Sequence, residues 1–259
     1  VEQIAKLKAM DYDIVIVSSG SVAEGMTRLG LQKRPIALHQ LQAAAAIGQA
    51  GLIQAYETRF KKFDLLTAQI LLVHDDLSSR TRYLNARQTL QSLLDSNVIP
   101  IVNENDTVAT DEIRFGDNDT LAGQVANLVD AERLVILTDQ QGVFTKDPRK
   151  YRAATLIQEC DVNDKTLDAA ASGSSGNLGR GGMSTKIKAA RLAARSGADT
   201  VITDGLTNNV IIRLANNECL GTRLSSIDSP ISQRKQWLSG SLASCGQLII
   251  DQGAETKLL

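Results

Sequence analysis

Short apolar runs alternate along the chain with longer stretches of helical periodicity. The apolar runs predict buried strands at 14–17, 65–73, 98–102, 134–137, 200–203 and 248–250. The periodic stretches predict helices at 1–10, 37–63, 83–95, 121–129 and 183–195. Such alternation is typical of a parallel sheet with helices on both faces. We therefore predict an α/β fold, a three-layer α/β/α sandwich with a mainly parallel central sheet.

Composition narrows the class of protein. Hydrophobic residues make up 43% of the 259 residues and aromatics only 3%, so Val, Ile, Leu and Ala must build the core. The net charge of −1 argues against a nucleic-acid partner, and the apolar runs are too short to span a membrane. Three widely spaced cysteines, Cys160, Cys219 and Cys245, fit a reducing compartment. We expect a soluble, cytoplasmic protein.

Polar loops follow three of the predicted strands and begin at Ser18, Asn103 and Thr138. Ligands of parallel sheets bind beyond the carboxyl ends of the strands. We therefore expect these loops to share one cleft. In the first, the small residues of 17–21 let backbone N–H groups approach an anion, although a plain strand-to-helix turn has the same composition.

The second loop holds two dense polar clusters, at 103–107 and 116–120. An Asn amide can donate to a carboxylate and an Asp can accept from an ammonium group, so together they suit an amino acid zwitterion. The carboxylates could instead fix a lysine or Mg²⁺ near phosphates. The alternative is a solvated loop in which Asp119 is the N-cap of the next helix.

A Gly-rich stretch at 173–182 leads into a helix that carries Lys186 in its first turns. The helix N-terminus and the ammonium group could both face a polyphosphate. The spacing is not that of a P-loop, and a surface loop before an amphipathic helix is the alternative. With only His39 and His74, no Ser/His/Asp or Cys/His constellation forms, so phosphoryl transfer fits better than covalent hydrolysis.

Six segments together resemble the amino acid kinase family over nearly the whole chain. They are V-S-S-G-S at 17–21, Y-L-N-A-R at 83–87, V-N-E-N-D-T-V-A-T at 102–110, G-D-N-D at 116–119, L-T-D-Q-Q-G-V-F-T at 137–145 and G-G-M-S-T-K at 181–186. The pair N-E-N-D and G-D-N-D separates the members that phosphorylate glutamate from most relatives. The resemblance implies ATP-dependent phosphorylation of the side-chain carboxylate of L-glutamate to L-glutamyl 5-phosphate, the first step of proline biosynthesis.

The resemblance also implies roles for individual residues. Glutamate would be held by Ser19, Asp106 and Asn118. Lys186 would neutralise charge on the transferring group, and Asp119 would orient the catalytic lysines. ATP would be bound by Thr138, Asp139, Arg180, Gly181, Gly182, Met183, Ser184, Thr185 and Lys186. Mg²⁺ would accompany ATP, proline would act as feedback inhibitor, and the chain would form a dimer or tetramer. The residues that would bind a metal are left unassigned.

The chain departs from the family pattern in three places. Arg180 stands where relatives often have Thr, which adds a cation near the phosphates. Family members begin with a V-V-K-L-G-T/S strand whose lysine contacts the transferred phosphate. We expect 1–245 to be the kinase catalytic domain without that strand, and a chain truly lacking it to have very low activity. Residues 246–259 resemble the start of a linker to a C-terminal PUA domain.

Two other interpretations stay open. Another family activity, such as acetylglutamate, carbamate or uridylate kinase, would use the same fold. A non-catalytic sensor of glutamate or proline would keep the amino acid pocket without phosphate transfer. An RNA-binding module has little support, because neither a basic patch nor an aromatic stacking motif is present.

Overall fold

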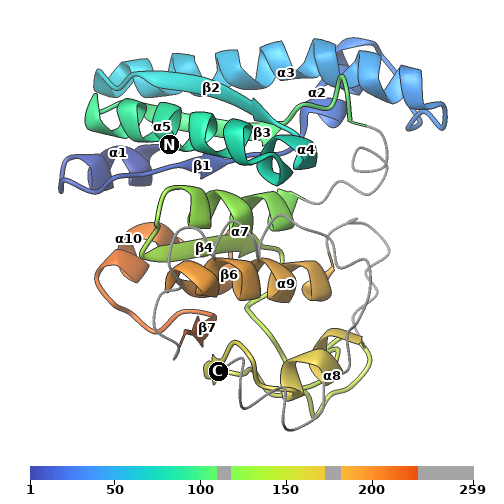
Figure 1. The fold of residues 1–259 in the computed structure, drawn as a ribbon. Helices are drawn as coiled ribbons and strands as arrows, with labels where there is room; N and C mark the ends of the chain where they lie inside the picture. Colours follow the sequence, from blue (N-terminus) through green and yellow to red (C-terminus); the bar gives the residue numbers. More distant parts are fainter. Residues whose placement is uncertain (110–117, 173–181, 227–259) are drawn as a thin grey trace, which may run out of the picture.

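Helices and strands alternate through the computed structural model (Figure 1), which describes residues 1–109, 118–172 and 182–226. The first half contains α1 (Glu2–Lys8), β1 (Ile16–Val17), α2 (Ser21–Arg28), α3 (Leu38–Phe60), η1 (Lys61–Phe63), β2 (Thr67–Leu72), α4 (His74–Ser78), α5 (Arg80–Asp95) and β3 (Ile99–Glu104). The second half contains α7 (Asn118–Leu128), β4 (Arg133–Thr138), β5 (Glu159–Asp161), α8 (Thr166–Ser172), α9 (Met183–Ala193), η2 (Ala194–Ser196), β6 (Asp199–Asp204), α10 (Val210–Ala215) and β7 (Thr222–Ser225).

Some of the predictions fall outside the described residues. They are the strand at 248–250, the linker at 246–259, the G-D pair at 116–117, and the ATP-site residues Arg180 and Gly181.

The strands form two hydrogen-bonded sheets. In the first, of order β1-β3-β2, both pairings are parallel. In the second, of order β4-β6-β7-β5, the β4–β6 and β5–β7 pairings are parallel and β6–β7 is antiparallel. The α/β class and the mainly parallel strand direction are thus confirmed. Within the described residues the hydrogen bonding divides the predicted central sheet into two.

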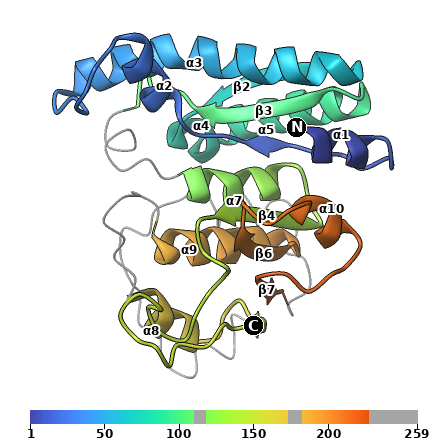
Figure 2. The ribbon, with the colours of Figure 1, turned by 180° about the vertical axis from the view of Figure 1, so that it is seen from behind.

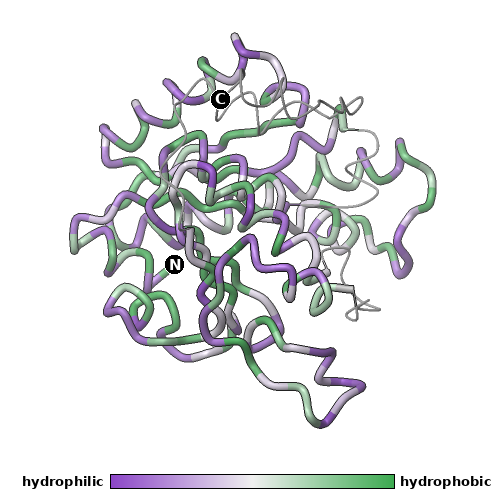
Figure 3. Tube along the Cα trace, turned by 60° about the horizontal axis from the view of Figure 1, so that its bottom comes forward, coloured by the Kyte–Doolittle hydropathy of each residue, from purple (hydrophilic) through white to green (hydrophobic). Residues whose placement is uncertain are grey.

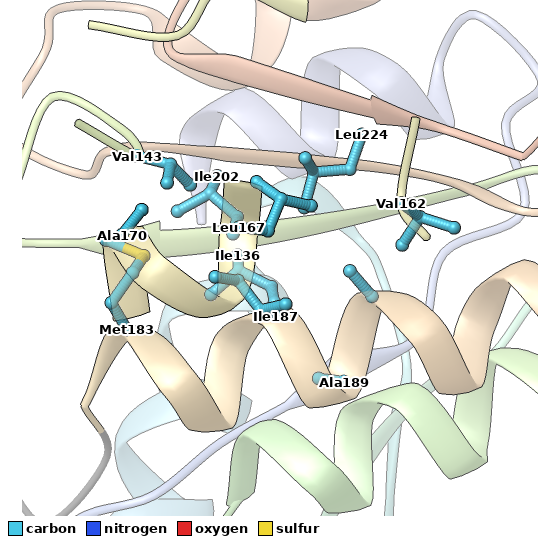
Figure 4. Close-up of a cluster of buried hydrophobic side chains, with 11 residues drawn as sticks. Ile136, Val143, Val162, Leu167, Ala170, Met183, Ile187, Ala189, Ile202 and Leu224 are labelled. Carbon is cyan, nitrogen blue, oxygen red and sulfur yellow. The ribbon is translucent and has the colours of Figure 1, made fainter. Parts of the chain in front are cut away.

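Helices cover both faces of the second sheet because its strands are apolar on both sides. On β4, Ile136 packs into a cluster with Ile187 of α9, whereas its neighbour Val135 packs beside Val210 of α10. Successive strand residues point to opposite faces, so α9 and α10 lie on opposite sides of the sheet. Figure 4 shows the cluster on the α9 side, where Ile136 and Ile187 lie next to each other. The alternation of hydrophobic and hydrophilic residues that makes such faces can be followed along the trace in Figure 3.

Pro100 occupies a position that the central strand β3 can tolerate. The backbone N–H of Ile99 donates to Leu66 on the β2 side, so the N–H that Pro100 lacks would face β1. β1 pairs with β3 only from Ile101 onward. The ladder therefore loses no hydrogen bond, as expected for a proline early in a strand.

Helix α7 lies at the junction of the two sheets. It packs against β1 and β3 of the first sheet, against β4 of the second, and against α5 and α9. In Figure 1, α5, α7 and α9 lie one below another, with α7 between the other two. The approach of α7 to α9 depends on Gly123, because a Cβ there would lie 2.5 Å from the carbonyl oxygen of Ala189. From behind (Figure 2), α1 and α10 lie beside each other and make a second contact between the halves.

Some element boundaries and two strands were not predicted. The short helix α4, which contains Asp75 and Asp76, was not predicted. The helix predicted over 37–63 ends at Phe60, and Phe63 follows it in η1 and is 43% exposed. β5 and β7 were missed because their sequences, Glu-Cys-Asp and Thr-Arg-Leu-Ser, show no apolar run. As for membranes, none of the described helices has the length and apolarity that a bilayer crossing requires.

Candidate functional site

The first loop of the site is the turn between β1 and α2. The N–H of Ser18 donates to the carbonyl of Val102 at 2.9 Å, which extends the pairing of β1 with β3 by one residue. Gly20 then adopts a φ of 108°, a left-handed conformation that a side chain would disfavour, and α2 begins at Ser21. Ser18 is buried, while Ser19, predicted to hold glutamate, is exposed at the tip of the turn.

Asp106 lies against this turn. The hydroxyl of Ser21 donates to Oδ2 of Asp106 at 2.6 Å, across 85 positions of sequence. Burial raises the pKa of Asp106 above its ordinary value of 3.8, although the Ser21 hydrogen bond and the charge of Arg34 both act to lower it. A half-buried carboxylate whose charge is incompletely compensated is suited to bind a cationic group such as an ammonium.

Asn118, the first residue of α7, joins the loops after β1 and β3. Its Nδ2 donates to the backbone carbonyl of Ser18 at 2.6 Å and to Oδ1 of Asn103 at 2.9 Å. The loops that begin at Ser18 and Asn103 therefore meet, as the parallel sheet predicted.

Asp119 faces a different partner, the start of α9. Nζ of Lys186 lies 2.8 Å from Oδ2 of Asp119, and Oγ1 of Thr185 donates to the same oxygen at 2.7 Å. Only 11% of the Lys186 side chain and 18% of the Asp119 side chain are exposed. Lys186 is therefore turned into the protein and does not face solvent. Asp119 is the second residue of α7 rather than its N-cap.

The predicted ATP residues lie at two places. Thr138 ends β4 and accepts from the N–H of Gly205 beyond β6, and its hydroxyl lies 3.3 Å from Oδ1 of the exposed Asp139. Gly182 precedes α9, whose first turn contains the remaining described members of the set, Met183, Ser184, Thr185 and Lys186. The side chain of Met183 packs in the hydrophobic core, so only its backbone is available to a nucleotide.

Two residues of α3 that the sequence analysis missed also reach this site. Oε1 of Gln49 accepts from Nδ2 of Asn103 at 2.7 Å, and the hydroxyl of Tyr56 lies 3.1 Å from Oγ of Ser18. Two helical turns before Gln49, Gln42 donates to the backbone carbonyl of Ala109. Polar residues seven apart on a mostly apolar helix share one face, and that spacing was the available signal.

The described residues give little basis for a metal site. No three His, Cys, Asp or Glu side chains among them come together as a metal-binding group. A metal here would need ligands from another source, such as the phosphates of a nucleotide.

Comparison with known proteins identifies the family. The model of the family described as "Amino acid kinase family" matches residues 1–204. The chain belongs to the amino acid kinase family. Among curated members, the glutamate 5-kinase of Nitrosomonas eutropha (strain DSM 101675 / C91 / Nm57) is 58% identical over 99% of this chain and 69% of its own length. The glutamate 5-kinase of Marinomonas sp. (strain MWYL1) is 58% identical over 100% of this chain and 69% of its own.

Solved structures of other kinases share the fold at low identity. The isopentenyl phosphate kinase of T. acidophilum is 15% identical, with a TM-score of 0.53 over 82% of this chain and 83% of that one. The uridylate kinase of Archaeoglobus fulgidus is 13% identical, with a TM-score of 0.55 over 86% and 89%. At this level of identity the likeness supports the amino acid kinase fold alone.

The environment of Asp106 predicts that this carboxylate destabilises the folded chain at neutral pH. Because its pKa is raised on folding, the stability that it contributes is present below pH 3.8 and is lost as pH rises through the raised pKa. Asp106→Asn keeps an acceptor for Ser21 and removes the charge. We expect it to raise the unfolding temperature near pH 7, with a difference that shrinks as pH falls towards 3.8.

Thermal unfolding followed by circular dichroism across this pH range tests the prediction. Asp13→Asn is a control, because Asp13 is an exposed carboxylate whose ion pair with Lys8 spans 3.5 Å and contributes little. An Asp106→Asn variant that unfolds at a lower temperature than the parent chain at neutral pH would contradict it.

Proposed function

We propose that this chain transfers the γ-phosphoryl group of ATP to the side-chain carboxylate of L-glutamate and forms L-glutamyl 5-phosphate, the first step of proline biosynthesis. The observation that carries the proposal is the 58% identity to proteins named glutamate 5-kinase over nearly the whole chain. The start of α7 supports it, because Asn118 contacts the turn after β1 while its neighbour Asp119 contacts Lys186 at the start of α9.

The glutamate end of the site would consist of Ser19, Asp106 and Asn118. The carboxylate of Asp106 would attract the substrate's ammonium group, since burial has left that charge only partly compensated. The turn at Ser19, which precedes the N-terminus of α2, would offer backbone N–H groups to a substrate carboxylate. Asn118 would bind between them from the start of α7.

The phosphate end would be formed by Lys186 and the first turn of α9. In the reaction, an oxygen of the glutamate side-chain carboxylate attacks the γ-phosphorus, and the bond from phosphorus to the bridging oxygen breaks. ADP leaves with that electron pair. Lys186 would stabilise the negative charge on the phosphoryl oxygens. Asp119, whose Oδ2 lies 2.8 Å from Nζ of Lys186, holds the ammonium group of this lysine in place.

The remaining ATP contacts would come from Thr138, Asp139 and the residues around the start of α9, including Arg180 and Gly181, which lie outside the described range. Mg²⁺ would arrive with ATP, held mainly by its phosphates and water, because the described residues hold no metal-binding cluster. Bound there, Mg²⁺ would supply positive charge beside the phosphates of ATP.

The family resemblance extends the proposal to regulation and assembly. Proline would inhibit by binding near the glutamate pocket. The chain would act in the cytoplasm as a dimer or tetramer, without a nucleic-acid or membrane partner. Exposed small and apolar residues on the outer face of α3, Ala43, Ala46, Ile47 and Ala50, support a subunit contact there.

Trapping the product tests the proposed substrate. The complete protein is incubated with ATP, Mg²⁺ and hydroxylamine, which converts an acyl phosphate into a stable hydroxamate. Hydroxamate should form with glutamate and not with N-acetylglutamate, and UMP should not stimulate ADP release. The reverse preference would refute the glutamate assignment. Calorimetry that detects glutamate binding and no ATP binding would instead favour a sensor.

Removing the ammonium group of Lys186 tests the proposed phosphate end. We expect Lys186→Met to lower kcat by about 10²–10³-fold with little change in the KM for glutamate, because charge develops at the phosphoryl group. Lys188→Met is the matched control, since Lys188 lies two residues along the same helix and is exposed. Steady-state kinetics gives both constants, and the unfolding temperature is measured because Asp119 loses its ion-pair partner. An unchanged kcat would contradict the assignment.

A further inference from the structure

A chain of side-chain amides connects α3 to the start of α7. Gln49 accepts from Asn103 at 2.7 Å, and Asn103 accepts from Asn118 at 2.9 Å. Asn118 also donates to the carbonyl oxygen of Ser18 at 2.6 Å. This relay, Gln49–Asn103–Asn118, crosses the carboxyl end of the first sheet next to the proposed glutamate pocket.

The hydrogen bonds of the relay can be donated in only one direction, from Asn118 to Asn103 and from Asn103 to Gln49. A backbone carbonyl accepts hydrogen bonds and never donates them, so the Asn118 atom facing Ser18 must be Nδ2. The same nitrogen faces Asn103, which must present its oxygen Oδ1 and turn its nitrogen towards Gln49. Gln49 must therefore present Oε1 to Asn103.

The far end of the relay shows the consequence of this direction. Nε2 of Gln49 is buried, and it has no hydrogen-bond partner among the described residues. An unpaired buried donor is unfavourable. If the Gln49 amide were flipped, its nitrogen would face the nitrogen of Asn103, and two donors would meet. The orientation that leaves Nε2 unpaired is therefore the one that fits the rest of the relay.

The near end of the relay determines what Asn118 can offer a ligand. Both hydrogens of its Nδ2 are used, one by Ser18 and one by Asn103. Its Oδ1 accepts no hydrogen bond from the described residues. Among those residues the buried atoms that lack a partner do not include this oxygen, so Oδ1 is accessible. Asn118 is therefore an acceptor towards the substrate and is suited to an ammonium group rather than a carboxylate.

We propose that Gln49 is a positioning residue that, by accepting from Asn103, holds the relay so that Asn118 presents Oδ1 to the ammonium group of the substrate. This inference rests on the proposed function, glutamate phosphorylation. It deepens that function by assigning part of the selectivity for a free amino group to a residue on α3. In the proposed pocket, Asp106 provides negative charge beside the turn after β1, and Asn118 provides an acceptor of fixed direction.

The test compares Gln49→Met, which keeps the volume and removes the acceptor, with Gln49→Glu, which keeps an oxygen facing Asn103 in either protonation state. In the complete protein we expect Gln49→Met to raise the KM for glutamate about three- to tenfold, the effect of one hydrogen bond. The KM for ATP should stay within about twofold, because the relay does not reach the phosphate end. Gln49→Glu should restore most of the glutamate KM.

Glutarate, which is glutamate without its amino group, separates positioning from general damage. Because glutarate has no ammonium group for Asn118 to bind, Gln49→Met should leave its KM, or its inhibition constant where turnover is slow, unchanged. The preference for glutamate over glutarate should thus fall about three- to tenfold. Gln54→Met, an exposed glutamine on the same helix, is the matched control.

The outcomes distinguish the two proposals. A parent protein that does not phosphorylate glutamate refutes the proposed function. A parent that does so, with a Gln49→Met variant that keeps its glutamate preference or loses affinity for glutarate and ATP equally, refutes the role of Gln49. If Gln49→Met does not fold, Gln49→Leu is used with the same comparison.

Discussion

The two hydrogen bonds that Nδ2 of Asn118 donates hold the functional site together. They fix the first turn of α7 to the ends of β1 and β3 at once, across 100 and 15 positions of sequence. The next residue along the helix, Asp119, lies on an adjacent side of it and holds Lys186 of α9. One turn of helix thereby sets the distance between the proposed amino acid and phosphate groups, and a phosphoryl transfer depends on such positioning.

The packing of α7 makes this arrangement rigid. Arg87 of α5 donates to the carbonyl of Leu128 at the other end of the helix and forms an ion pair with Asp130. In the middle, Gly123 lets the helix approach α9 to backbone contact. A helix held at both ends and along its length transmits little motion to the residues in its first turn.

The site also contains groups that folding alone would not favour. Asp106 is a carboxylate whose charge is disfavoured by burial, and Gln49 leaves a buried donor unpaired. Both groups lie where a substrate ammonium group would be recognised, one by its charge and the other through the direction of the relay. Such departures from the most stable arrangement are expected at functional sites.

The sequence predicted the parts of the fold that depend on continuous apolar runs. β3 and β4 were placed within about two residues. β5 and β7 could not be, because their stability comes from pairing with distant strands rather than from their own residues. The division of the strands into two sheets is likewise a property of long-range pairing.

For the site, motif resemblance singled out Asp106, Asn118 and Lys186, which lie in the loop after β3, at the start of α7 and in the first turn of α9. Their roles in binding and catalysis stay predictions. The resemblance implied different roles for Asn118 and Asp119, and in the structure these adjacent residues face different partners. That follows from the turn of about 100° between successive helical residues. Gln49 lies 54 positions from Asn103, so only the tertiary structure brings the two together.

The central claim is that the first turn of α7 places amino acid and phosphate on adjacent sides. A crystal structure of the complete protein with glutamate and a non-hydrolysable ATP analogue tests it most directly. We predict the ammonium group of glutamate within hydrogen-bond distance of Oδ1 of Asn118, and the γ-phosphate beside Nζ of Lys186. A glutamate bound with its carboxylate on Asn118, or a γ-phosphate remote from α9, would contradict the account.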